Sequence, residues 1–308
     1  MSTDDRRAIH MNPAKAPCAA LTMVRGEDFF LDRWLAHYRK WLPDKHIYVL
    51  NHGGDEAVAH IARGVNVISL PYDETKKSVN QRRWQILSLY TSGLTQFYNW
   101  VICNDVDELV VLDPEAGDDL VGYLLRHGAI AGSAPVLIPF AIEMVHVPEL
   151  EPEPLTQDAP ILGRRRVYRL NSNYAKPCIT SVPLEFKAGG HGSNARKFAV
   201  DPHLYNFHLR FVDYPMCMAR LDKSLARRLD GKSPEEVSAM TKAGWGWNSA
   251  AGTFDALSRQ HPERETIDHP EFRKKMVEAQ ISRPPFTLMG GGRPAGTYRL
   301  PERFSGLF

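Results

Sequence analysis

Two aspartates one residue apart end an apolar run in "VICNDVDELVVLD", residues 101–113. If extended geometry continues through them, the side chains of Asp105 and Asp107 project to the same side. Two carboxylates at the end of a buried strand repel each other unless a cation or protons come between them. Mg²⁺ and Mn²⁺ take oxygen ligands and keep positions for water and substrate phosphates. The pattern therefore predicts a metal site, and the alternative is an acidic turn capped by Asp105 with Asp107 in solvent.

Alternating strand and helix patterns precede this pair and must position it. Apolar runs predict strands, and apolar residues at helical spacing predict helices. The expected strands cover residues 18–24, 46–51, 65–70 and 97–104, and the expected helices lie within 25–43, around 56–63 and over 78–94. This alternation is typical of parallel βαβ units, so we expect an α/β fold with a mostly parallel sheet flanked by helices.

Polar side chains follow several of these strands. In parallel sheets, ligands gather beyond the carboxyl ends of the strands. That edge is expected to carry Arg25, Glu27, Asn51 and the two aspartates. The guanidinium of Arg25 suits a planar anion such as phosphate, whereas Glu27 also favours the positive end of the helix that it opens.

Composition limits the function classes. The chain has 308 residues, which suits one large α/β domain with elaborations or two small domains, and we expect one domain. A net charge of +2 argues neither for nor against nucleic acid, and we expect no nucleic-acid partner. Four scattered cysteines show no zinc spacing, and reduced buried thiols fit a cytoplasmic protein. No segment is apolar enough to cross a bilayer, and residues 1–17, which lack a secretory core, are expected to form a flexible arm.

The alternation weakens after about residue 145. A proline-rich acidic loop is expected over 147–160, then short strands, then helical patterns from Asp213 onward, including 233–243. The predicted organisation is the arm, a catalytic domain over 18–230, and a helical and extended C-terminal extension over 231–308 packed on the same domain.

Several motifs together resemble the GT-A-type glycosyltransferases. The closest similarity is to a bacterial family-two-like group related to the family-92-type enzymes. The matching pieces in this chain are Arg25-Gly26-Glu27, "WLAHY" at 34–38, "NHGGD" at 51–55 and "DVDEL" at 105–109. "KPCITSV" with "GGHGS", and "YNFHLRFVDYPMCMARLDKS", are also similar to the family, so the resemblance covers roughly residues 18–230.

The chain departs from that family pattern at several places, including "FHLRF", which lacks the aromatic residue that usually follows the His, and Val212-Asp213, near which the usual Ser is replaced. Gly26 stands where the family usually has Asn, and Asn51 stands where an Asp often contacts the nucleotide. The segment "IPFAIEMVHVPELEP" does not reproduce the family's Trp-x-x-Phe-Gly stretch, which helps to shape the acceptor side.

The resemblance implies a GT-A-like fold and transfer of a sugar from a nucleotide-diphosphate donor to an acceptor hydroxyl. The donor is expected to be a UDP-sugar, the acceptor a glycan or a lipid-linked molecule, the stereochemistry inverting, and the cofactor Mn²⁺ or Mg²⁺. A role in polysaccharide assembly, cytoplasmic or peripheral at the inner membrane face, is the corresponding biological expectation.

The resemblance also implies roles for single residues. Asp105 and Asp107 would carry the metal and the donor diphosphate, and His208 would complete the metal site. Donor contacts are expected from Arg25, Glu27, Asn51, His191 and one of Arg82 and Arg83, with Lys176 as a weaker phosphate contact. Glu143 is the expected general base, with Glu185 and Asp213 as rivals.

Two other functions remain open at this point. A nucleotidyltransferase would carry a glycine-rich, lysine-containing phosphate loop after the first strand, and "MVRGEDFF" has no such loop. The second alternative is a non-catalytic carbohydrate- or protein-binding module that retains the fold.

Overall fold

The computed structural model describes residues 11–72, 79–229, 233, 235–236 and 246–308. Contacts between residues divide the chain into two compact units. Unit 1 contains residues 1–142, 171–207 and 269–293, and unit 2 contains residues 143–170, 208–268 and 294–308.

Unit 1 is built on four parallel strands. They are β1 (Ala16–Val24), β2 (Ile47–His52), β3 (Asn66–Leu70) and β4 (Tyr98–Cys103). Their order is β3-β2-β1-β4, with every neighbouring pair parallel. The chain therefore winds outward from β1 to β3 and then returns to the other side of β1, which creates a topological switch point where such folds bind ligands.

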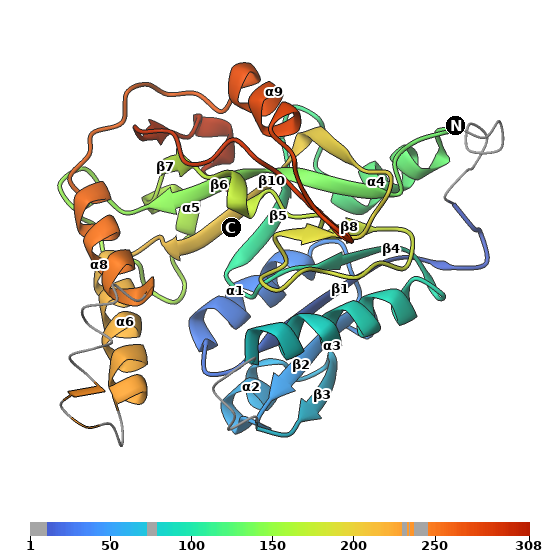
Figure 1. Ribbon diagram of the computed structural model, residues 1–308, viewed down its shortest axis with the longest axis horizontal. Coiled ribbons are helices and arrows are strands. Elements are labelled where there is room, and N and C mark those ends of the chain that lie inside the picture. Colours follow the sequence, from blue (N-terminus) through green and yellow to red (C-terminus); the bar gives the residue numbers. More distant parts are fainter. Residues whose placement is uncertain (1–10, 73–78, 230–232, 234, 237–245) are drawn as a thin grey trace. The chain divides into compact units, whose positions relative to one another are not determined.

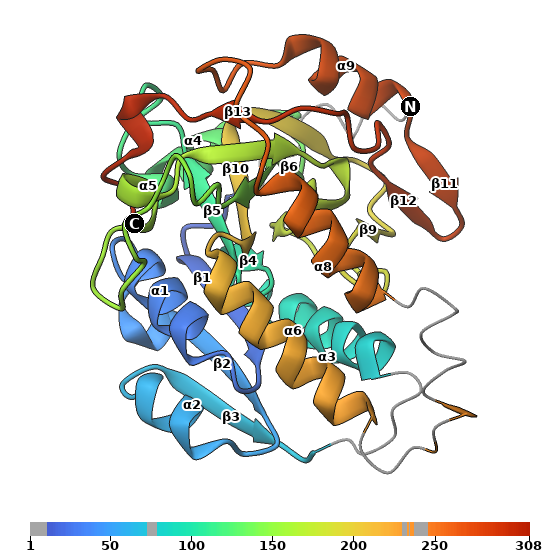
Figure 2. The same ribbon diagram turned by 90° about the vertical axis from the view of Figure 1, so that its left-hand side faces the viewer.

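Helices cover both faces of these strands. They are α1 (Asp28–Tyr38), α2 (Glu56–Ile61), α3 (Val79–Leu94) and α4 (Leu120–Ala129), with a short 3₁₀ turn η2 (Asp44–His46) before β2. Figures 1 and 2 both show α3 on the face of β1–β3 opposite to α1 and α2. This is the right-handed crossover geometry expected of βαβ units.

Antiparallel strands extend the sheet of unit 1 beyond β4. β8 (Ile179–Thr180) pairs with β4 and with β6 (Val136–Val145) in antiparallel fashion. β5 (Glu108–Leu112) and β6 pair with β10 (Ala199–Phe211). A small separate sheet joins β9 (Gly192–Ser193), β11 (Ile281–Arg283) and β12 (Phe286–Leu288), and the remaining elements of unit 1 are η3 (Ser172–Tyr174) and α9 (Pro270–Glu278).

The buried cluster between α3 and the sheet is centred on Trp84, which is 1% exposed. Leu21, Leu50 and Cys103 reach it from three parallel strands, and Phe186 meets the indole edge-on, with the ring centroids 5.4 Å apart. Such aromatic packing fixes the helix on the sheet. It therefore also fixes the position of Arg82 and Arg83, which immediately precede Trp84 on α3.

Unit 2 gathers the ends of two long strands with the helical C-terminal part of the chain. It contains the last residues of β6 and β10, β7 (Val167–Leu170) paired antiparallel with β13 (Tyr298–Arg299), and α5 (Ile161–Arg164). α6 (Tyr214–Leu229), α8 (Gly246–Leu257) and the turn η4 (Glu302–Phe304) complete it. Phe211 stacks on Phe254 at 4.8 Å in its core, so α8 is tied to the end of β10.

The structure confirms the predicted fold class, a mixed α/β fold with a mostly parallel sheet flanked by helices and helical segments toward the C-terminus. The boundary predicted at residue 230 coincides with none of the unit divisions, and the catalytic domain of residues 18–230 stays a prediction. The first ten residues of the predicted arm and most of the helix predicted over 233–243 lie outside the described residues.

Candidate functional site

The acidic residues after β4 form a turn and do not continue the strand. β4 ends at Cys103, and the backbone N–H of Glu108 donates to the carbonyl of Asp105 over 3.0 Å before β5 begins. The extended geometry that would have placed Asp105 and Asp107 on one face is therefore not present. We call residues 105–108 the acidic turn.

Asn104 anchors the acidic turn to α1. Its side-chain carbonyl accepts a hydrogen bond from the indole of Trp34 over 2.9 Å, and its amide donates to the hydroxyl of Tyr38 over 3.0 Å. The same hydroxyl accepts from the backbone N–H of Val110 over 3.2 Å. All of these groups are buried, so each needs its partner. The aromatic face of α1 thus sets the start of the turn.

Asp105 is held by two cations. Lys176 Nζ lies 2.6 Å from its Oδ2, and Arg83 Nη2 lies 2.5 Å from its Oδ1. Lys176 Nζ also lies 2.5 Å from Oε1 of Glu108, whose other oxygen accepts from the Asn206 amide over 3.1 Å. We call Asp105, Glu108, Lys176 and Arg83 the charge cluster. Two carboxylates and two cations meet here, and the charge of Asp107 also acts on Arg83.

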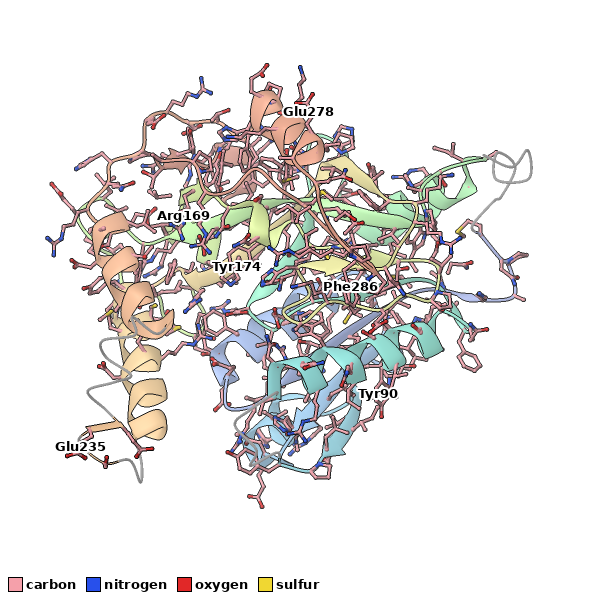
Figure 3. The ribbon with its side chains drawn as sticks, viewed as in Figure 1. Tyr90, Arg169, Tyr174, Glu235, Glu278 and Phe286 are labelled. Atoms are coloured by element: carbon pink, nitrogen blue, oxygen red, sulfur yellow. The ribbon has the colours of Figure 1, made fainter. Side chains whose placement is uncertain are left out.

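Lys176 is 1% exposed, which is rare for a lysine. Its ammonium lies 5.3 Å from the ring of Trp84 and 5.8 Å from the ring of Tyr174, which Figure 3 labels. Pro177 follows, and a proline disfavours helical geometry in the residue before it. The segment around Lys176 is neither helix nor strand, and it places the ammonium between Asp105 and Glu108 as the counter-charge of both acids. The sequence suggested Lys176 only as a phosphate contact.

The opposite charges in the cluster shift the pKa values of Asp105 and Lys176 toward their ionised forms. Burial raises the pKa of Asp105, but the charges of Arg83 and Lys176 outweigh burial and hold it well below its usual range. Burial lowers the pKa of Lys176, but Asp105 and Glu108 outweigh it and raise that pKa above the ordinary lysine value. Both groups are therefore charged over the whole physiological pH range.

A pocket of about 180 Å³ lies at the carboxyl edge of the sheet. Its lining comes from the ends of β1, β2 and β3 and from the first turns of α3. The residues are Met23, His52, Leu70, Pro71, Val79, Arg82, Arg83 and Ile86. We call it the edge pocket. Arg83 links it to the charge cluster, because its Nη2 also donates to the carbonyl of Met23 over 3.0 Å.

The edge pocket suits an anionic ligand with an apolar part. Arg82 and Arg83 project from the first turns of α3, where the helix dipole is also positive. Next to it, the guanidinium of Arg25 stacks 3.7 Å from the ring of Tyr72, and His52 lies 6.0 Å from the same ring. A ligand with rings and phosphates would find both kinds of partner here.

Other predicted donor contacts have local structural roles. The amide of Asn51 donates to the carbonyl of Asp55 and its oxygen accepts from the Asp55 N–H, both over 2.9 Å, so Asn51 closes the turn before α2. Glu27 occupies the position before α1 without a side-chain cap. Gly26 has a φ of +61°, a conformation that favours Gly and Asn, which accounts for glycine where the family usually has asparagine.

His191 lies on a glycine turn that packs against Trp84. Gly190 has a φ of +68°, and a Cβ on it would overlap the Trp84 indole, so only glycine fits. Nδ1 of His191 is 2.6 Å from the carbonyl of Asn173, and its ring lies 6.2 Å from that of Tyr174. The rings of Tyr174 and Trp84 therefore lie near both the His191 turn and the ammonium of Lys176.

Glu143 and His208 meet in unit 2. Glu143 is 1% exposed and pairs with Nε of Arg169, the β7 residue labelled in Figure 3. Nδ1 of His208 lies 3.4 Å from the other Glu143 oxygen. Burial raises the pKa of Glu143, but contact with His208 and the charge of Arg169 outweigh burial and lower it to about 2. A carboxylate held this way is a weak proton acceptor at neutral pH.

The two rival bases lie in different surroundings. Asp213 is buried in unit 2, where Nη2 of the fully buried Arg165 reaches its Oδ2 at 2.8 Å. Glu185 is exposed in unit 1, on a groove of about 570 Å³ that the outer side of α3 forms with residues 183–185. The role of general base stays a prediction for Glu143, Glu185 and Asp213 alike.

The residues present do not fit the predicted metal centre. Within the described part of the chain, no three side chains of His, Cys, Asp or Glu form a group that could hold a metal ion. His208 faces Glu143, and both oxygens of Asp105 already contact cationic side chains. A dication at Asp105 would have to displace Lys176 or Arg83.

Comparison with known proteins adds little. No family model matches the chain, and no curated protein matches it. Among solved structures, the chain is similar to one described as mannose-1-phosphate geranyltransferase from Thermus thermophilus, with 17% identity and a TM-score of 0.27 over 73% of this chain and 68% of the other. A likeness this distant adds nothing to what the strands and side chains show. The resemblance to GT-A-type enzymes stays a prediction, and nothing supports the finer link to the family-92-type group.

No helix in the described segments has the length and apolar character needed to cross a bilayer. The predicted cytoplasmic location is not tested by this finding.

Proposed function

We propose that this protein is a glycosyltransferase that binds a nucleotide-diphosphate sugar, expected to be a UDP-sugar, in the edge pocket. The observation that carries the proposal is the position of the pocket. It lies at the carboxyl ends of β1, β2 and β3, and Arg82 and Arg83 line it beside the acidic turn. In α/β folds of this winding, phosphorylated ligands bind at that edge.

The proposed reaction places the developing charge near the arginines. The acceptor oxygen bonds to the anomeric carbon, the bond from that carbon to the diphosphate oxygen breaks, and the electron pair leaves with the diphosphate. The hydroxyl proton passes to a base, a role that stays a prediction for Glu143, Glu185 and Asp213. Arg83 and Arg82 would stabilise the leaving diphosphate by charge-assisted hydrogen bonds. Inversion at the anomeric carbon also rests on the resemblance.

A binding experiment tests the proposal. Thermal unfolding of the protein is followed with UDP, GDP and ADP, each with and without its sugar. Saturation with the correct nucleotide at about 100 times Kd should stabilise the fold by about 2.7 kcal/mol. The control variant Arg63→Gln, at an exposed arginine after α2, should retain this stabilisation, and Arg82→Gln should weaken it. A protein that responds to none of these ligands is not the proposed enzyme.

The alternative, a non-catalytic carbohydrate- or protein-binding module, has one observation in its favour. Glu143 and Asp213, two of the three candidate bases, are buried in ion pairs. Release of UDP from a UDP-sugar in the presence of candidate acceptors separates the two functions. Binding of the donor without any turnover across a broad acceptor panel would favour the module.

A further inference from the structure

Two cationic side chains of the protein occupy the positions on Asp105 that a divalent cation would take. Lys176 Nζ lies 2.6 Å from Oδ2, and Arg83 Nη2 lies 2.5 Å from Oδ1. The contact with Lys176 is a charge-assisted hydrogen bond, and the contact with Arg83 is an ion pair. Each carboxylate oxygen that could bind a metal therefore already has a positively charged partner.

Lys176 is not free to withdraw from the acidic turn at low cost. It is 1% exposed, and its ammonium is shared between Asp105 and the fully buried Glu108. A dication on Asp105 would confront this ammonium across a short distance in a site with little water, where repulsion between like charges is strong. Moving Lys176 away would leave Glu108 without its counter-charge.

Arg83 can meet a phosphate while it stays bound to Asp105. Its Nη2 contacts both Asp105 and the carbonyl of Met23, while its side chain, 25% exposed, lines the edge pocket. A guanidinium carries five N–H donors in a planar fork, so contacts through Nη2 leave donors on the other nitrogens. Its fixed position on α3, next to the buried Trp84, pre-organises it for a diphosphate.

We propose that this site binds the diphosphate of its nucleotide without a divalent cation, with Arg83 as the positive group that contacts the diphosphate and Lys176 in the place of the metal on Asp105. This inference rests on the proposed function, since it concerns the same pocket. Asp105 and Lys176 act as positioning residues that orient Arg83.

Calorimetric titration with UDP, GDP and ADP tests the inference on the full chain. One series contains EDTA, and a matched series contains Mn²⁺ or Mg²⁺. The expected result is the same Kd in both series for the nucleotide that binds. Arg83→Gln should weaken that binding about tenfold or more with EDTA present, because it removes a charged donor. Arg63→Gln, the matched control, should leave Kd unchanged.

A second variant reports on the place of the metal itself. Lys176→Met removes the ammonium and keeps most of the length of the side chain, so Asp105 and Glu108 lose the cation that they share. Mn²⁺ alone should then raise the melting temperature of Lys176→Met but not that of the wild-type protein. If Lys176→Met does not fold, the titration of the wild-type protein with EDTA still decides.

The outcomes separate this inference from the proposed function. Equal binding with EDTA and with metal supports it. Binding that appears only with Mn²⁺ or Mg²⁺ overturns it and leaves the nucleotide-sugar transferase intact. An absence of binding by every nucleoside diphosphate in both series rejects the proposed function, and the inference with it.

Discussion

Replacement of Lys176 by methionine should cost a large part of the stability of the protein. Lys176 Nζ lies 2.6 Å from Asp105 and 2.5 Å from Glu108, and the residue is 1% exposed. Methionine fills much of the same space but leaves Glu108 buried without its counter-charge. Breaking a buried ion pair from one side typically costs about 3–5 kcal/mol, and we expect Lys176→Met to lose that amount of unfolding free energy.

The assay is urea unfolding followed by tryptophan fluorescence, with Glu108→Gln and the double variant completing a cycle. Glutamine removes the charge of Glu108, while its side-chain oxygen can still accept the hydrogen bond from Asn206. The two losses should therefore not add, and the coupling between them should reach about 1–3 kcal/mol. Lys45→Met, at an exposed lysine, is the control and should change stability by less than about 0.5 kcal/mol.

Two results would refute this reasoning. A loss below about 1 kcal/mol for Lys176→Met is what an exposed ion pair would give. Additive losses in the cycle would show that Lys176 and Glu108 do not interact, even if each residue matters by itself.

Three further predictions concern other parts of the chain. Burial raises the pKa of Glu143, but His208 and Arg169 outweigh burial and lower that pKa from 4.5 to about 2. Because the pKa is lower in the folded protein, the ionised Glu143 stabilises the fold by about 3 kcal/mol above about pH 4.5. This stabilisation is lost as the pH falls toward 2. Urea unfolding at a series of acidic pH values should show this loss, and Glu143→Gln should flatten it; equal slopes in both proteins would contradict the assignment. Gly190→Ala should destabilise the protein by about 2 kcal/mol or more in thermal unfolding. The backbone at this position has a φ of +68°, which is strained for alanine, and the added Cβ would overlap the ring of Trp84. Gly93→Ala near the end of α3, where the new Cβ meets nothing within 4 Å beyond its chain neighbours and the helix's own backbone, is its control and should not destabilise; similar losses in both variants would argue against the clash. Tyr38→Phe removes the hydroxyl that accepts from Asn104 and from the Val110 N–H, and should cost about 1–3 kcal/mol in urea unfolding; an unchanged midpoint would mean that the acidic turn does not depend on α1.

Hydrophobic periodicity was sufficient to predict most of the parallel half of the fold. The strands expected over 18–24, 46–51, 65–70 and 97–104 correspond to β1, β2, β3 and β4. Buried parallel strands read as continuous apolar runs, and amphipathic helices repeat at 3.6 residues, so both leave a local signal. β8 left little signal, because its two residues are held by pairing with β4 and β6 and not by a pattern of their own.

The predicted metal centre is an example of contacts that local sequence patterns do not determine. The spacing of Asp105 and Asp107 suggested two carboxylates on one face, but a turn closed by the hydrogen bond from Glu108 to Asp105 replaces the extended strand. The sequence placed His208 beside them by resemblance, whereas its ring contacts Glu143. The spacing of the residues predicts neither the turn nor the contact between His208 and Glu143, because both depend on side chains from segments that are distant in the sequence.

By itself, the sequence determined that this chain builds parallel βαβ units and that acids follow β4 while arginines open α3, because strand and helix periodicity act over short stretches. Only the tertiary structure decided what those acids meet. Lys176 lies 71 positions after Asp105 in the sequence, and it is the counter-charge of Asp105 and Glu108 because the fold places its ammonium next to both carboxylates. Burial strengthens the attraction between Lys176 and the two carboxylates. No local sequence pattern determines which distant residue supplies the charge that a buried carboxylate needs.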